Sequence, residues 1–328
     1  MIRLSRPGLG VALTMALVAG PSVRASEPDK LLPADCDSVI SINIRQIIES
    51  DIVKKYALEQ MKQALQGNDA RKFLGDLGLD PLKDIERVVV GGTGKDQTDM
   101  KYLVIVHGKF DPEKLYKAAQ AQTQKEPDRF SLVRDGQDKM FKFQPDDGNP
   151  IYGTVIDEGT IVMANDKKGV SAALAASLSG KKAVINRDLA TLIAKQDDKA
   201  SLWMAMVLKG KLDNVKLPNG PGVNPALKDH LAKLDTATVV IRVNTDVTLD
   251  VGFIMPDAAT AAGMGASVDE ILQQVKGFAP FLAASDPKLK PLVDVVKTLK
   301  SEVKDKSVLI SARLTGVAIG QMIKPTDE

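Results

Sequence analysis

Four short apolar runs follow one another in residues 130–164, FSLVRDGQDKMFKFQPDDGNPIYGTVIDEGTIVMA. Each run is rich in β-branched or aromatic residues, and Asp-Gly or Glu-Gly pairs lie between the runs. Such pairs are typical of tight hairpin turns, which join strands that are antiparallel neighbours. The stretch therefore predicts four strands, at 130–134, 140–144, 151–156 and 160–164, in an antiparallel sheet.

The same pattern continues on both sides of this stretch. Alternating or β-branched runs predict further strands at 38–44, 86–91, 101–107, 202–208, 238–244, 248–255, 308–314 and 317–323. Apolar residues at helical spacing, with capping residues, predict helices at 46–66, 70–77, 168–178 and 188–195, and others that begin at Asp111-Pro112, Asn224-Pro225, Ser267 and Asp286-Pro287. The predicted fold class is α+β.

The order of elements is similar in the two halves of the chain. The run at 202–208 corresponds to 38–44, and the pair 238–244 and 248–255 corresponds to 86–91 and 101–107. We expect two similar lobes, each a curved antiparallel sheet with helices packed on one face, whose sheets can join into one. The pattern suggests an internal duplication, although strand-helix-strand-strand order also recurs by chance.

The first 25 residues have the layout of a secretory signal peptide. Arg3 and Arg6 precede an apolar core at 11–20, and the core is shorter than the roughly 20 residues of a membrane span. Pro21 breaks the helix, and small residues precede a cleavage site between Ala25 and Ser26. The alternative is a short buried helix. The predicted division is a signal peptide at 1–25, an N-terminal lobe at 26–198 and a C-terminal lobe at 199–328.

The charge of the chain changes when that segment is removed. The full chain of 328 residues has 44 basic and 42 acidic side chains, but the first 25 residues hold three arginines and no acid. The mature chain thus has 41 basic residues against 42 acidic ones, a net charge of −1. A nearly neutral protein has no overall field with which to gather nucleic acid, and we expect no nucleic-acid partner.

The residues that commonly carry chemistry are few. The chain has one Cys and two His, and His107 and His230 lie far apart in the sequence with no metal-ligand motif around them. The string at 91–96, GGTGKD, lacks the first glycine and the hydroxyl residue of a phosphate-binding loop, so it is interpreted as a hairpin loop. We predict no catalytic residue, no cofactor and no metal site. Cys36 is interpreted as an inert, partly buried thiol.

Three segments near the start of the mature chain resemble exported bacterial proteins of uncharacterised families. They are Leu32-Pro33-Ala34-Asp35, the Ser-Val-Ile-Ser-Ile strand at 38–42, and the Gly-Leu-Asp-Pro-Leu-Lys-Asp-Ile segment at 78–85. The resemblance covers roughly the first hundred mature residues and implies no known activity and no catalytic residue.

Three functions remain open from the sequence. The first is a non-catalytic, periplasmic or secreted protein that acts by binding or as a structural component of the envelope. The second is a periplasmic carrier or chaperone of a lipid or other apolar ligand, since the predicted amphipathic helices are able to line a cavity. The third is an enzyme with a dispersed site. The expected partner is a protein or an apolar ligand, and no further run is long enough to span a membrane.

Overall fold

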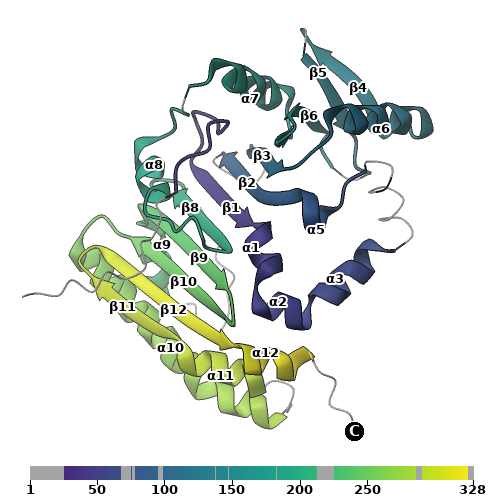
Figure 1. The fold of residues 1–328 in the computed structure, drawn as a ribbon. Helices are drawn as coiled ribbons and strands as arrows, with labels where there is room; N and C mark the ends of the chain where they lie inside the picture. Colours follow the sequence, from purple (N-terminus) through teal and green to yellow (C-terminus); the bar gives the residue numbers. More distant parts are fainter. Residues whose placement is uncertain are drawn as a thin grey trace, which may run out of the picture.

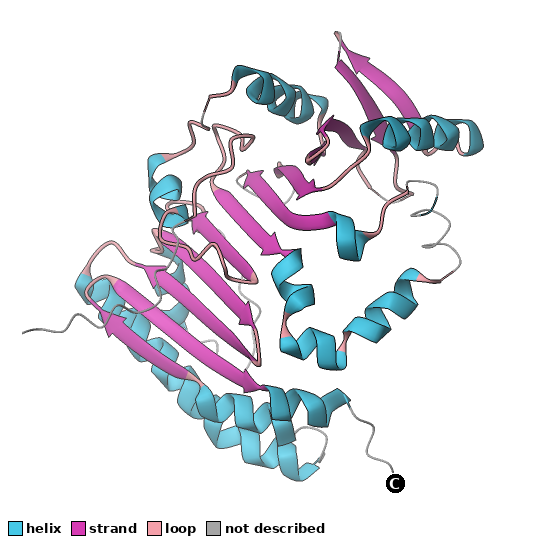
Figure 2. Ribbon diagram, in the orientation of Figure 1, coloured by secondary structure: helices cyan, strands magenta, loops and turns pink. Residues whose placement is uncertain are grey.

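The computed structural model describes residues 26–67, 75, 78–94, 99–136, 138–146, 148–181, 183–212, 225–285 and 290–323. Within these residues, twelve strands form one sheet in which each strand is antiparallel to its neighbours (Figures 1 and 2). The strand order is β11-β12-β10-β9-β8-β1-β2-β3-β7-β6-β5-β4. The α+β class and the antiparallel sheet predicted from the hairpin pattern are confirmed.

The strands have these bounds: β1 Ser38–Asn43, β2 Ile85–Thr93, β3 Lys101–Gly108, β4 Phe130–Asp135, β5 Asp138–Phe143, β6 Ile151–Asp157, β7 Thr160–Ala164, β8 Leu202–Val207, β9 Thr236–Val243, β10 Asp246–Ile254, β11 Lys300–Lys304 and β12 Ser307–Thr315. The helices are α1 Ile44–Glu49, α2 Asp51–Tyr56, α3 Leu58–Leu65, α5 Pro81–Asp84, α6 Pro112–Lys125, α7 Lys167–Ser179, α8 Arg187–Ile193, α9 Pro225–Ala232, α10 Ala258–Ser285, α11 Lys290–Thr298 and α12 Gly316–Ile323.

The two halves of the chain meet where β1 pairs with β8 in the middle of the sheet. Ile40 lies opposite Met204 in this pair. The carboxylate of Asp198 lies 2.5 Å from a guanidinium nitrogen of Arg87 on β2, and Asp197 lies 3.7 Å from Arg242 on β9. The β1–β8 pairing makes the sheet continuous across the middle of the chain, and these two ion pairs bind the segment just before β8 to a strand of each half.

The two faces of the sheet carry different sets of side chains because the side chains of a strand alternate. We call the first face the one that carries Val39, Leu103 and Ile105; it packs against α7 and α8. The second face carries an apolar row of directly paired residues that crosses eleven strands: Leu132, Phe141, Gly153, Met163, Val104, Val90, Ile40, Met204, Val239, Val251 and Ile310. This face packs against α6 at one end of the sheet and against α10 at the other.

Helices cover both faces of the sheet. In the N-terminal half, α6 lies on the opposite face from α7 and α8, which the sequence pattern did not indicate. In Figure 1, α6 lies beside β4–β6 at one end of the sheet, and α10 and α11 run along β11 and β12 at the other. The second face therefore has two separate helical coverings.

The helix predicted at 46–66 is wrong as a single element. It consists of α1, α2 and α3, which Figure 1 shows as a bent chain leading away from β1. Ser50 has an extended backbone, its hydroxyl donates to the Ile47 carbonyl, and its oxygen accepts from the Val53 N–H. A serine that binds the backbone in this way ends one helix and caps the next.

Three further elements differ from the predictions near the C-terminus. Ser267 does not begin a helix, because α10 already begins after Asp257, whose carboxylate accepts from the Thr260 N–H at 2.7 Å. The residues before Ser267 are mostly Ala, which favours helix. Residues 300–304 form β11 instead of continuing a helix, and the strand predicted at 317–323 is α12, whose first turn is capped by the Thr315 hydroxyl. The predicted helix at 70–77 lies outside the described residues except for residue 75.

Candidate functional site

An apolar cavity of about 640 Å³ lies between α6 and the second face of the sheet. Its floor comes from β3, β5, β6 and β7, and α6 forms its roof. Fifteen of the eighteen lining residues are apolar: Leu79, Ile85, Val106, Phe110, Leu115, Ala118, Ala119, Phe130, Phe141, Phe143, Ile151, Gly153, Val155, Ile161 and Met163. The other three are Gln122, Glu126 and Arg129.

The roof forms because α6 turns one side toward the sheet. Asp111 caps the helix by accepting from the Lys114 N–H at 3.0 Å, and Pro112 occupies its first turn. Leu115, Ala118, Ala119 and Gln122 follow at spacings of three and four residues, which places them on one helix face. Only Leu115 of this set is fully buried. The two alanines have short side chains, so the helix leaves space above the sheet.

The floor is built by phenylalanines that the strand pattern brings together. Phe141 and Phe143 alternate along β5 and therefore point to the same face. Phe130 on β4 pairs with Phe143, and the centroids of their rings are 4.8 Å apart. With Phe110, four of the eight phenylalanines of the chain line this one cavity. Rings of this size hold α6 away from the strands and give the cavity a wide apolar wall.

The polar groups of the cavity gather where α6 ends and β4 begins. Gln122 donates to a carboxylate oxygen of Glu126 at 2.9 Å. The guanidinium of Arg129 lies 3.8 Å from Glu126 and 3.5 Å from Asp146, and it stands 5.6 Å from the centroid of the Phe143 ring. The cavity thus has an apolar body and a polar end, which is the arrangement that orients an amphipathic ligand.

The predicted cleavage site is only partly within the described residues. Ala25 and the rest of the predicted signal peptide at 1–25 lie outside them. Ser26 is described: it is 3% exposed, and its backbone N–H donates to the Gln196 carbonyl at 3.2 Å.

The residues weighed as chemical candidates do not meet in the cavity. His107 on β3 lies 2.5 Å from the carboxylate of Asp29 in the N-terminal segment. The ring of His230 packs against Gly263 of α10, where an added Cβ would lie 2.6 Å from the ring. Cys36 is 1% exposed, its thiol donates to the Ser38 carbonyl, and burial raises the pKa of that thiol to about 11. A thiol with this pKa is almost wholly protonated at neutral pH and is a poor nucleophile.

The described part of the chain has neither a cluster of metal-binding side chains nor a membrane-spanning helix. No group of three or more His, Cys, Asp or Glu side chains there is placed to hold a metal ion. None of the helices described is both long enough and apolar enough to cross a membrane.

None of the residues that line the cavity is among the site residues predicted from the sequence. The alternation Phe141-x-Phe143 and the facing positions Phe130 and Leu132 do indicate a strongly apolar hairpin face. The sequence does not show which helix covers this face, because α6 precedes the hairpin in the chain and approaches it only through the tertiary fold. The signal in the sequence that could have indicated the cavity is an apolar hairpin face that follows a helix containing alanines.

The comparisons with known proteins show no family. No family model matches the chain, and no curated protein matches it. Among solved structures, the crystal structure of aspartate kinase from Synechocystis aligns with 88% of this chain and 53% of its own length, at 10% identity and a TM-score of 0.16. The chain therefore spans about half the length of that protein, and a likeness at this TM-score carries no argument about fold or activity.

Proposed function

We propose that this protein is exported to the periplasm or the medium and binds an apolar ligand, such as a lipid, in the cavity beneath α6. The observation that carries the proposal is the cavity itself, of about 640 Å³ with fifteen apolar lining residues out of eighteen. Volumes of about 300–1,000 Å³ with mainly apolar walls are typical of small-molecule binding sites. The protein acts as a carrier or holder of this ligand and performs no chemistry on it.

The polar end of the cavity favours a ligand with one polar group. The body of the ligand lies among the phenylalanines, and its polar group lies near Gln122, Glu126 and Arg129. The side chain of Arg129 is 45% exposed, so its guanidinium is accessible to a polar group on the ligand at this end of the cavity. An apolar chain with a polar head satisfies both ends of the cavity.

Export is the second part of the proposal, and it rests on the pattern at 1–25. Cleavage after Ala25 would make Ser26 the first residue, with its amino group beside the Gln196 carbonyl. N-terminal sequencing of protein from the cell envelope or the medium tests this part. The expected first residue is Ser26, and an intact Met1 in the exported fraction would contradict it.

The binding test uses the fluorescence of N-phenyl-1-naphthylamine, which rises in apolar surroundings. We expect the delipidated protein to bind this probe and a long-chain fatty acid to displace it. Ala118→Phe places a ring in the cavity and should weaken probe binding by about tenfold or more, because a filled site must be repacked before a ligand enters. The matched control is Ala121→Phe, which adds the same ring to an exposed position of the same helix outside the lining residues.

The control separates loss of the cavity from loss of the fold. Unchanged probe binding in Ala118→Phe, or an equal loss in Ala121→Phe, would contradict binding beneath α6. No probe binding by the wild-type protein would favour the envelope structural component instead. Circular dichroism of all three proteins verifies that each is folded.

A further inference from the structure

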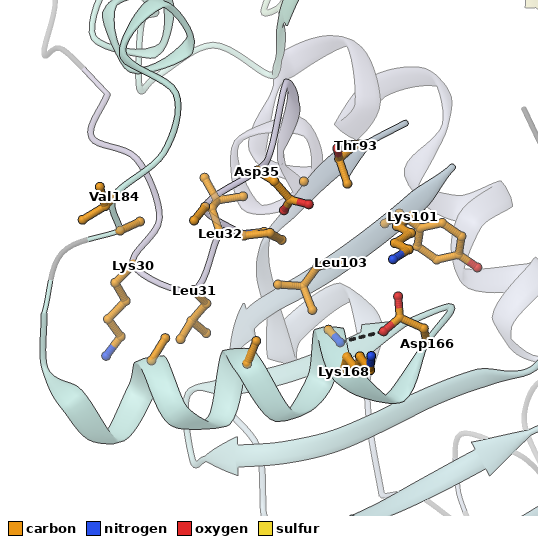
Figure 3. Close-up of a pocket in the computed structure, with 18 of the residues that line it drawn as sticks. Lys30, Leu31, Leu32, Asp35, Thr93, Lys101, Leu103, Asp166, Lys168 and Val184 are labelled. Carbon is orange, nitrogen blue, oxygen red and sulfur yellow. Dashed lines mark hydrogen bonds between the residues drawn. The ribbon is translucent and has the colours of Figure 1, made fainter. Parts of the chain in front are cut away.

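A second cavity, of about 420 Å³, lies on the first face of the sheet (Figure 3). It is enclosed by the N-terminal segment at 30–35, by α7 with the residues that follow it, and by the ends of β2 and β3. Since Leu103 of β3 points to the first face and Val106 to the second, this cavity and the one beneath α6 lie on opposite sides of the same strand.

The floor and one wall of this second cavity are apolar. Leu31 and Leu103 form the floor, and these residues are 2% and 1% exposed, respectively. Ala172 and Ala176 are one helical turn apart on α7 and form the wall. Val184 lies at the rim and is 83% exposed, which is unusual for a large apolar side chain beside an apolar floor. An apolar chain lying along α7 would cover Val184 and remove this surface from water.

The charge at the rim is mainly positive. Four lysines line the cavity, namely Lys30, Lys101, Lys168 and Lys181, against two acids, Asp35 and Asp166. The carboxylate of Asp166 caps α7 by accepting from the Gly169 N–H at 2.8 Å, as Figure 3 shows, and it keeps its negative charge, so the four lysines and two acids leave a net positive charge at the rim. Among the described residues, no carboxylate forms a salt bridge with Lys101 or Lys168.

Lys101 and Lys168 lie at one end of the cavity. Asn165, just before the cap of α7, binds the start of β3 twice: its side chain accepts from the Tyr102 N–H at 3.1 Å and donates to the Met100 carbonyl at 2.8 Å. This contact holds the first residue of β3 near the first turn of α7. Figure 3 shows Lys101 and Lys168 at the end where Asp166 lies, and Lys30 and Val184 at the other.

We propose that this cavity is a binding site for an amphipathic anion, with its carboxylate or phosphate group at Lys101 and Lys168 and its alkyl chain along Ala172, Ala176 and Val184. Two ammonium groups without carboxylate partners supply charge-assisted hydrogen bonds to an oxyanion. The apolar floor and wall supply the burial of the chain. The site is separate from the cavity beneath α6 and does not depend on the function proposed for that cavity.

The test is a titration of the full chain followed by the NMR signals of its alanine methyl groups, which report each cavity separately. Decanoate, decyl phosphate and decanol are the three probes. We expect both anions to shift the Ala172 and Ala176 methyl signals and decanol to leave them unchanged. Lys101→Glu combined with Lys168→Glu should weaken anion binding at these methyls by about tenfold. The matched control, Lys209→Glu with Lys233→Glu, makes the same charge change at exposed positions outside the cavity and should change affinity by less than about twofold.

Three outcomes would exclude the proposed anion site. If neither anion shifts these methyls, if decanol shifts them as strongly, or if both double variants lose affinity equally, the anion site is absent. A comparison of decanoate with decyl phosphate distinguishes a fatty acid from a phosphorylated lipid as the source of the oxyanion. Shifts at Ala118 and Ala119 instead would report the cavity beneath α6, so failure here is distinct from failure of the proposed function.

Discussion

The second face of the sheet is covered by α6 at one end and by α10 at the other, and the two coverings differ. Beneath α10, Met255, Met264 and Val308 are each at most 2% exposed, and they pack into a core cluster. Beneath α6, Leu115 packs but the alanines that follow leave a cavity of about 640 Å³. The apolar row of the sheet is common to both regions, so the side chains of the covering helix decide whether a core or a cavity results.

The two ends of the sheet therefore contribute differently to stability and to ligand binding. A packed interface stabilises the fold through dense contacts, whereas a cavity forgoes those contacts along its lining. The C-terminal half therefore supplies the packed end of the sheet, and the N-terminal half holds the cavity. The central β1–β8 pair joins the two into one sheet.

The largest expected effect comes from truncating the packed side. Met264→Ala should lower the free energy of unfolding by about 2–5 kcal/mol, because it removes a buried side chain from a filled core and leaves a void. Urea denaturation followed by circular dichroism measures it. A loss below about 1 kcal/mol would mean that the region beneath α10 is loosely packed as well, and the contrast with α6 would disappear.

A pair of identical substitutions should give opposite results at the two helices. Ala261→Leu adds a side chain at a position of α10 that is 0% exposed, and it should destabilise the protein by about 1–3 kcal/mol through overpacking. Ala118→Leu adds the same atoms over the cavity and should be neutral or stabilising, because there is space for them. Equal destabilisation in both variants, measured in urea, would show that α6 is packed as tightly as α10.

A smaller effect concerns the N-terminal segment that closes the first face of the sheet. Burial by itself raises the pKa of Asp29, but its hydrogen bond to His107, the Leu31 N–H and nearby positive charge outweigh this and hold the pKa below its ordinary value of 3.8. A carboxylate with a lowered pKa stabilises the fold above its unfolded pKa, and this contribution is lost as the pH falls through the folded pKa. Asp29→Asn should therefore cost about 1 kcal/mol at pH 6 and almost nothing at pH 2. The same cost at both pH values would exclude the charge of Asp29 as its source.

The strands were predictable because alternation is a local signal. The run 130–164 contains its own turns, and all four of its strands form as expected. The break in the helix at 46–66 was not predictable from apolar spacing. It results from one hydroxyl, that of Ser50, which hydrogen-bonds to the backbone on both sides. The final segment, 317–323, alternates like a strand, but β12 ends at Thr315 and Gly316 donates its N–H to Asp246 of β10.

The cavity was less predictable than the sheet that carries it. Phe141 and Phe143 are visible in the sequence as one apolar strand face, yet the sequence does not say which helix covers them or how closely. Ala118 and Ala119 read as ordinary helix formers, and only their position over the phenylalanines gives them a meaning for ligand binding. The predicted helix at 46–66 and those predicted to begin at Ser267 and Asp286 are amphipathic, yet none of their described residues lines the cavity beneath α6.

The central claim is that the space beneath α6 holds an apolar ligand in the cell. Native mass spectrometry of the protein purified from the envelope of its own cells tests it most directly, with Ala118→Phe and Ala121→Phe prepared in the same way. We predict that the wild-type protein and Ala121→Phe carry a lipid-sized adduct and that Ala118→Phe does not. A wild-type protein without any adduct, or an adduct retained in full by Ala118→Phe, would contradict the account.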